Sequence, residues 1–125
     1  MHTLYIEQTC RTPLIRFTDG KLRIWGTFVP ENPDEFYLPI HEWVKKYSIA
    51  PVPETIVDLG LTYTRGYAMN YIQKLLQELI LLNNEQHKVI INWYYAPNSI
   101  SIKAGDHLSK KMNYIFNFLE VEEIL

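Results

Sequence analysis

The sequence predicts one α/β domain over residues 1–125, built on a mixed sheet of four to six strands. Apolar segments of strand length alternate with segments of helical periodicity, which is typical of this fold class. A turn signal near the N-terminus indicates a hairpin. Two main helices and a short third helix are expected to connect the later strands, and such crossover connections allow strands to lie parallel.

The N-terminal part is predicted to form strands. Short apolar segments occur at Thr3–Ile6 and Pro13–Phe17. Asp19-Gly20 is a turn dipeptide between two apolar segments. We therefore expect a hairpin in which Leu14–Phe17 pairs with Leu22–Trp25.

The first helix is predicted over Asp34–Tyr47, where apolar residues recur at helical spacing. Asn32 is a suitable N-cap, and Pro33 suits the first helical position. Acidic residues follow at the start and Lys45-Lys46 stand at the end, which matches the helix dipole. Pro39 would remove an internal hydrogen bond, so a kink or a late helix start is expected there.

The rest of the chain continues the alternation of strands and helices. The helix that begins at Gly66 has the widest apolar stripe in the chain. The expected order is a strand at Thr55–Tyr63, a helix at Gly66–Leu82, a strand at Lys88–Tyr95, a short helix at Ala104–Met112 and a final strand at Tyr114–Val121.

Composition excludes several classes of protein. The net charge of −2 gives no basic footprint for nucleic acid. Cys10 is the only cysteine, so an internal disulfide is impossible. No segment has the pattern of a signal peptide or the length of a membrane span. A cytoplasmic protein that contacts neither nucleic acid nor membrane is expected, as a monomer or weak dimer.

The residues show no catalytic machinery. The four histidines lack metal-ligand spacing, and there is no phosphate-binding glycine loop or nucleophile elbow. Asp58 lies inside a strand and could be a general base, although a charged side chain on the surface of the sheet is the simpler interpretation. Trp93-Tyr94-Tyr95 could stack on a ligand or simply pack. We therefore expect a protein that is not an enzyme and holds no metal or cofactor.

Fragments spread over most of the chain resemble one bacterial family, the SiaC-type regulatory phosphoproteins, formerly a domain of unknown function. These proteins have a STAS-like (SpoIIAA-like) fold, named after the anti-sigma factor antagonists. The matching fragments are Thr12-Pro13, Gly20-Lys21-Leu22, Gly26, Pro30-Glu31-Asn32, Phe36-Tyr37, Trp43, Tyr47, Asp58-Leu59, Leu61, Tyr63, Asn92-Trp93-Tyr94-Tyr95, Ala104-Gly105 and Phe116-Asn117-Phe118.

The resemblance implies a partner-switching signalling protein. In this family a Thr or Ser lies where a central strand turns into the following helix. A histidine-kinase-like serine/threonine kinase phosphorylates that residue, a phosphatase restores it, and one state binds a downstream diguanylate cyclase. A phosphate there meets the free N–H groups of a helix N-terminus, and in a docking face it repels an apolar or acidic partner.

This chain departs from the family pattern at the expected functional turn. Gly66 falls on the phosphoacceptor position, and glycine cannot be phosphorylated. Asn70 replaces the family's lysine one turn later, and Ala96–Ser99 replaces an acidic loop. Thr64 is the nearest threonine, as a substitute acceptor or as a helix cap. The resemblance therefore implies a divergent member whose phospho-switch is lost or displaced.

Two functional hypotheses follow. The first is a non-catalytic regulatory protein that contacts partners through residues at the strand-to-helix turn and nearby, namely Arg65, Tyr67, Ala68, Asn70, Tyr71, Asn32 and Tyr94. The second is a sensor that binds a small ligand or anion at the same helix N-terminus beside Arg65. An enzyme is the weakest reading, because it would need a site assembled from distant residues.

Overall fold

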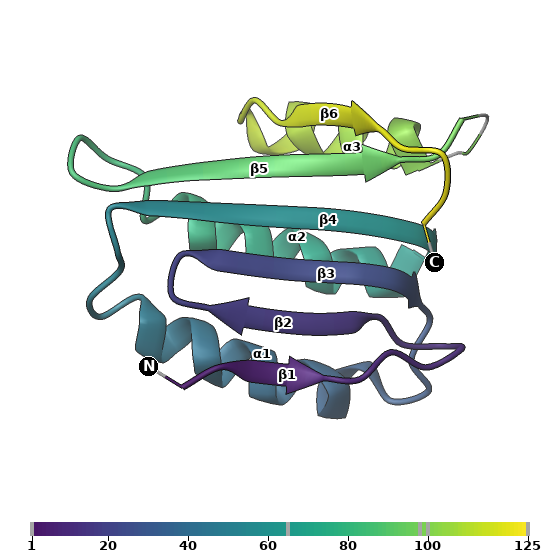
Figure 1. The fold of residues 1–125 in the computed structure, drawn as a ribbon, viewed down its shortest axis with the longest axis horizontal. Coiled ribbons are helices and arrows are strands. Elements are labelled where there is room, and N and C mark those ends of the chain that lie inside the picture. Colours follow the sequence, from purple (N-terminus) through teal and green to yellow (C-terminus); the bar gives the residue numbers. More distant parts are fainter. Residues whose placement is uncertain (1, 65, 98, 100, 125) are drawn as a thin grey trace.

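The computed structural model describes residues 2–64, 66–97, 99 and 101–124. Within these ranges the chain forms one six-stranded mixed sheet whose strands lie in chain order (Figure 1). The strands are β1 (Leu4–Ile6), β2 (Leu14–Thr18), β3 (Lys21–Phe28), β4 (Glu54–Thr64), β5 (Lys88–Tyr95) and β6 (Asn117–Glu120). The helices are α1 (Pro33–Tyr47), α2 (Gly66–Ile80) and α3 (Ser101–Met112). The predicted fold class is confirmed.

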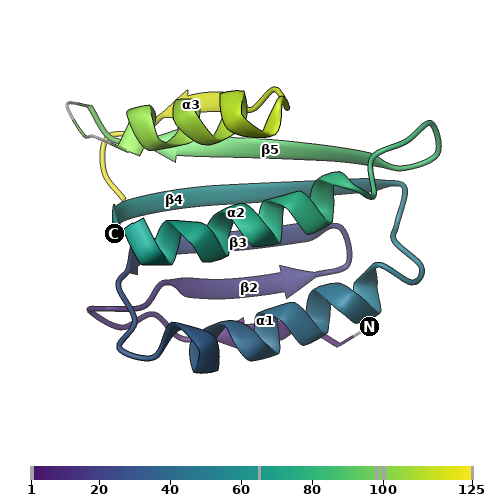
Figure 2. The ribbon, with the colours of Figure 1, turned by 180° about the vertical axis from the view of Figure 1, so that it is seen from behind.

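The sheet changes from antiparallel to parallel along its width. The β1–β2 and β2–β3 pairs are antiparallel, and the pairs from β3 to β6 are parallel. Each parallel connection passes through a helix, and every new strand is added on the same side of the previous one. Since such crossovers share one hand, α1, α2 and α3 all cover the same face (Figure 2). No described helix covers the other face, which we call the open face.

The predicted hairpin is confirmed in its register. Leu14 lies opposite Trp25, and Phe17 lies opposite Leu22. Gly20 in the connecting turn has a φ of 85°, a conformation that side chains rarely adopt.

Helix α1 begins at Pro33, so the expectation of a late start at Pro39 is wrong. The Asn32 side chain accepts a hydrogen bond from the Glu35 backbone N–H and donates one to the Glu35 carboxylate. This reciprocal cap secures the first turn. The helix then continues through Pro39, because burial of its inner face outweighs one missing hydrogen bond.

Some element boundaries differ from the sequence prediction. Helix α2 ends at Ile80 rather than Leu82, and α3 begins at Ser101, earlier than Ala104. Strand β6 is shorter than the predicted Tyr114–Val121. Tyr114 instead donates its hydroxyl proton to the Val89 carbonyl, which holds the segment before β6 against β5.

The core lies between the sheet and its helices. Trp93 on β5 is 1% exposed, and its ring Nε1 donates to the Ser101 carbonyl at the start of α3. The same ring lies against Gly105, where a Cβ atom would stand 2.6 Å from ring carbons. The other fully buried large side chains include Tyr47, Phe17, Phe28, Ile15, Leu22, Ile24, Leu59, Leu61, Leu75, Leu76 and Leu79.

Replacing Gly105 with Ala should lower the free energy of unfolding by about 1–3 kcal/mol, because the buried Trp93 ring cannot retreat. Gly66→Ala is a matched control, since a Cβ there meets nothing within 4 Å. We expect it to change stability by less than about 1 kcal/mol. Urea denaturation measures both values. Equal effects would contradict the tight contact between Trp93 and α3.

Candidate functional site

The predicted strand-to-helix turn lies where β4 ends and α2 begins. Thr64 is the last residue of β4 and pairs with Phe28 of β3, and Gly66 is the first residue of α2. Because β3 and β4 are parallel, the loop from β3 to α1 leaves the sheet at the same end as the turn from β4 to α2 (Figure 1). Arg65 lies outside the described residues. The end of β4 and the start of α2 therefore lie at the same end of the sheet as the β3–α1 loop.

Two tyrosines tie the start of α2 to the start of α1. The Tyr67 hydroxyl donates to the Pro30 carbonyl over 3.3 Å, while 42% of the residue stays exposed. One turn later the Tyr71 hydroxyl donates to the Asp34 carboxylate. That hydrogen bond, together with desolvation and the charge of Asp34, raises the pKa of Tyr71. The Tyr71 phenol therefore remains a donor well into alkaline conditions.

The remaining residues predicted on this edge differ in accessibility. Asn70 is exposed, whereas Ala68 is 0% exposed and packs in the core. Asn32 stands beside Pro30, but its side chain is occupied in capping α1. A partner would therefore meet this region mainly through Tyr67, Asn70 and the backbone at Gly66. We call the set Asn32, Thr64, Gly66, Tyr67, Asn70 and Tyr71 the α2 edge.

Gly66 stands in open space, and no left-handed φ requires a glycine there. A serine or threonine side chain would fit at this position without a clash. No acidic residue occupies the first turn of α2. The local structure would therefore accommodate a phosphorylatable serine or threonine at position 66. The position lacks a phosphoacceptor only because its residue is glycine.

Tyr94 lies apart from the α2 edge. It projects on the open face, where its ring packs edge-on against Trp25 at 5.2 Å between centroids. The Trp25 ring in turn packs over Gly60. The Arg23 guanidinium carbon lies 4.0 Å from the centroid of the Trp25 ring. The structure therefore divides the predicted binding residues between two faces of the sheet.

Asp58 belongs to this open-face cluster. Its carboxylate accepts a hydrogen bond from Asn92 at 3.0 Å and lies 4.0 Å from Arg23. Desolvation and the charge of Asp58 raise the pKa of Tyr94, and Arg23 opposes this effect. The sequence analysis did not predict this cluster. Arg23 and Trp25 alternate with the apolar residues of β3, and this alternation indicates that both side chains lie on the outward face of the strand.

Features that would suggest other functions are not found in the described part of the chain. No group of three or more His, Cys, Asp or Glu residues there could hold a metal ion. None of its helices is long and apolar enough to cross a membrane.

Comparison with known families decides the assignment. The sequence model of the SiaC family regulatory phosphoproteins matches residues 6–121, which is nearly the whole chain. The chain belongs to the SiaC family. A search of curated proteins found no match.

Solved structures show the same fold. SiaC of Pseudomonas aeruginosa is 23% identical, with a TM-score of 0.77 over 95% of this chain and 97% of that one. The structure of apo-SiaC from the same organism is 25% identical, with a TM-score of 0.69 over 96% and 98%. A chain in the crystal structure of the diguanylate cyclase SiaD in complex with its activator SiaC, from P. aeruginosa, is 21% identical, with a TM-score of 0.85 over 94% and 99%.

Several fragments that resemble the SiaC family have structural roles here. Trp93 and Gly105 form the contact between β5 and α3. Asn32 caps α1, and Tyr47 shares a buried 2.6 Å hydrogen bond with Thr55. These residues maintain the SiaC fold, so they do not report on whether the phospho-switch is kept.

The charges around Tyr94 predict opposite pKa changes in two variants. Asp58→Asn removes a negative charge that disfavours tyrosinate and should lower the pKa of Tyr94, whereas Arg23→Gln should raise it. NMR titration of the tyrosine Cζ carbons measures both shifts. Tyr114 is the internal control, because burial alone raises its pKa. Shifts of the same sign in the two variants would contradict the described cluster.

Proposed function

We propose that this SiaC-family protein is a non-catalytic regulator that binds a diguanylate cyclase through the α2 edge. The family match carries this proposal, together with the complex that SiaC of P. aeruginosa forms with the cyclase SiaD.

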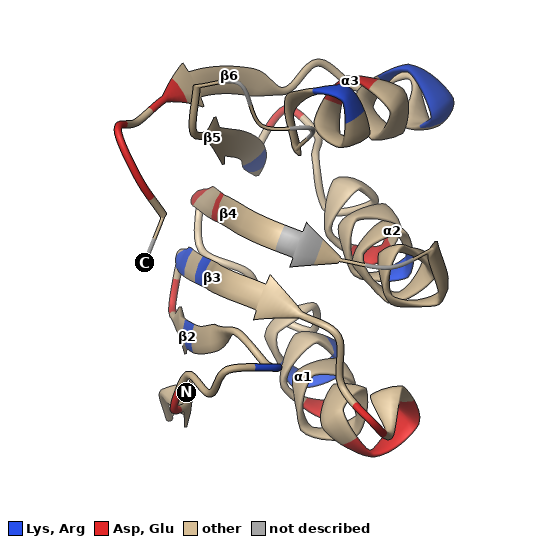
Figure 3. Ribbon diagram, turned by 90° about the vertical axis from the view of Figure 1, so that its right-hand side faces the viewer, with Lys and Arg blue, Asp and Glu red and all other residues tan. Residues whose placement is uncertain are grey.

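The chemistry of the α2 edge supports partner binding. Tyr67 presents an exposed aromatic ring with its hydroxyl anchored at Pro30. Tyrosines held in this way contribute contact area at a small entropic cost and are frequent at interface centres. Asp34 and Glu35 make the neighbouring start of α1 acidic, as Figure 3 shows in red. A cyclase surface with aromatic and basic side chains would complement this edge.

We further propose that phosphorylation no longer controls this turn. Gly66 has no hydroxyl, and Thr64 is half-buried and paired with Phe28 at the end of β4. The other hypothesis, an anion sensor at the same helix start, depended on Arg65, which lies outside the described residues. The family match favours the regulatory protein instead.

Tyr67→Glu should weaken cyclase binding by roughly tenfold or more, because it removes the exposed aromatic ring and the hydroxyl that anchors this ring at Pro30. The cyclase is first identified by co-purification from the native host, then affinity and cyclic diguanylate synthesis are measured with purified proteins. Tyr5→Glu is the matched control, because Tyr5 is an exposed tyrosine on the far edge strand β1. Unchanged affinity in the Tyr67 variant, or equal loss in both, would refute the α2 edge as the docking site.

Loss of the switch predicts that protein purified from the native host carries no phosphate on the segment around Thr64 and Gly66. Phosphopeptide mapping measures this directly, and phosphatase treatment should leave cyclase binding unchanged. Gly66→Ser is the positive control, because the position has room for the side chain. Phosphorylation of Thr64 that alters binding would show that the switch is displaced rather than lost.

A further inference from the structure

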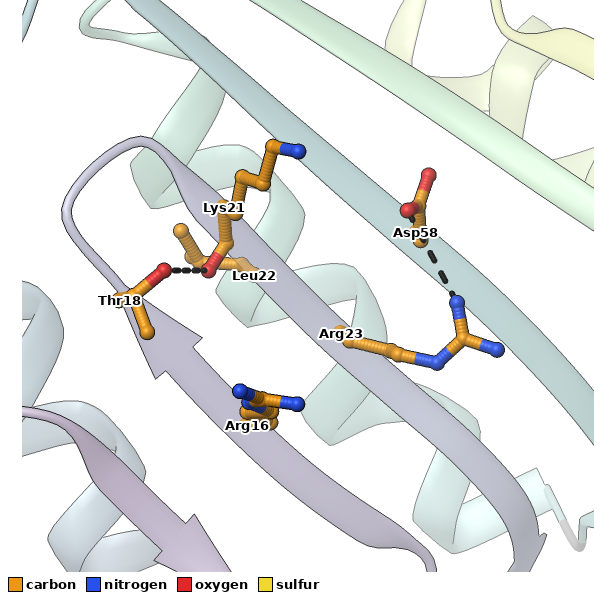
Figure 4. A pocket seen from close by; sticks show the side chains of 6 residues that line it. All are labelled: Arg16, Thr18, Lys21, Leu22, Arg23 and Asp58. Carbon is orange, nitrogen blue, oxygen red and sulfur yellow. Dashed lines mark hydrogen bonds and ion pairs between the residues drawn. The ribbon is translucent and has the colours of Figure 1, made fainter.

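A pocket of about 360 Å³ lies on the open face, away from all the helices (Figure 4). Its size falls in the range of small-ligand sites, roughly 300–1,000 Å³. It is lined by Arg16, Thr18, Lys21, Leu22, Arg23 and Asp58. The pocket thus gathers basic side chains from the β2–β3 hairpin, and Figure 3 shows these two strands in blue where the basic residues stand.

The strand register places like charges together. Arg16 lies directly opposite Arg23 across the hairpin, and Lys21 projects on the same face two residues before Arg23. Like charges directly opposite each other on neighbouring strands are destabilising. The protein therefore keeps an unfavourable arrangement at this place, and a bound anion would convert it into a favourable one.

The pocket has more positive than negative charge. Among the described residues that line it, Asp58 alone is acidic, and that carboxylate is already shared between Asn92 and Arg23. Arg16 and Lys21 are exposed, and neither forms an ion pair with any residue that the structure describes. Two cations of the pocket thus have no ion-pair partner among the described residues, in a protein whose net charge is −2.

The arrangement of the donors is suited to a phosphate group. A guanidinium group binds phosphate oxygens with two parallel hydrogen bonds, and an ammonium group acts as a mobile point charge. The pocket offers guanidinium and ammonium donors from neighbouring strands. The Thr18 hydroxyl also lines it and donates a hydrogen bond to the Lys21 carbonyl. Arg23 is held in place by Trp25 and Asp58, so part of the site is already ordered.

We propose that this pocket binds a small molecule carrying a phosphate or diphosphate group, with Arg16, Lys21 and Arg23 as its ligands. Three cations around one pocket are too few and too local for nucleic acid, which needs an extended basic surface. The pocket lies at the hairpin end of the sheet, and the α2 edge lies at the opposite end of β3 (Figure 1). Ligand binding here is therefore separate from the proposed docking of a cyclase.

Isothermal titration calorimetry at low salt with inorganic pyrophosphate and inorganic phosphate tests the proposal. We expect saturable binding of one pyrophosphate per chain, tighter than phosphate because it carries more negative charge. Arg16→Gln and Lys21→Gln should each weaken pyrophosphate binding by about tenfold to a hundredfold. Lys46→Gln is the matched control, since it removes the same charge from an exposed site at the end of α1 and should have no effect.

Thermal unfolding separates a binding role from a structural one. Without ligand, Arg16→Gln should unfold at the same or a higher temperature, because it removes a repulsion with Arg23. Tyr67→Glu should still bind pyrophosphate, and Arg16→Gln should still bind the cyclase, so each proposal can fail alone. Unsaturable binding, an equal loss in the Lys46 variant, or tighter binding of an acidic peptide than of pyrophosphate would overturn the phosphate site.

Discussion

The placement of all helices on one face of the sheet is the constraint on which the rest of the structure depends. Parallel strands added in one direction require crossovers of one hand, and these bring α1, α2 and α3 to the same side. One set of alternate residues is then buried, as Val57 and Leu59 on β4 illustrate with 0% exposure. The other set, which includes Asp58, faces outward and is available for polar chemistry.

A contact between a glycine and a tryptophan packs each face of the sheet. On the covered face Trp93 lies against Gly105 of α3, and on the open face Trp25 lies across Gly60 of β4. In each case any side chain larger than hydrogen would overlap the ring. The first contact fixes a helix to the sheet. The second aligns Trp25 with Tyr94 and gives the open face its ordered aromatic cluster.

The two proposed binding regions follow from the same topology. The C-terminal ends of parallel strands meet at one edge, which places the α2 edge beside the β3–α1 loop. The β2–β3 hairpin turn lies at the opposite end, and its basic residues stand on the open face. Because the two proposed regions lie at opposite ends of β3, a partner protein at one and a small anion at the other would not compete for the same residues.

The sequence by itself determined the fold class, the hairpin register and the cap of α1, because these depend on local patterns such as alternation and helical spacing. Its fragments also showed the resemblance to the SiaC family. It also identified Gly66 as a position without a hydroxyl. Only the tertiary structure decided that Tyr94 lies on the opposite face from Tyr67 and that Ala68 is buried. The hairpin register already places Arg16 opposite Arg23, but only the tertiary structure brought Asp58 of β4 to them and formed the pocket. Such relations depend on which strands pair and which face the helices cover, and no local pattern encodes them.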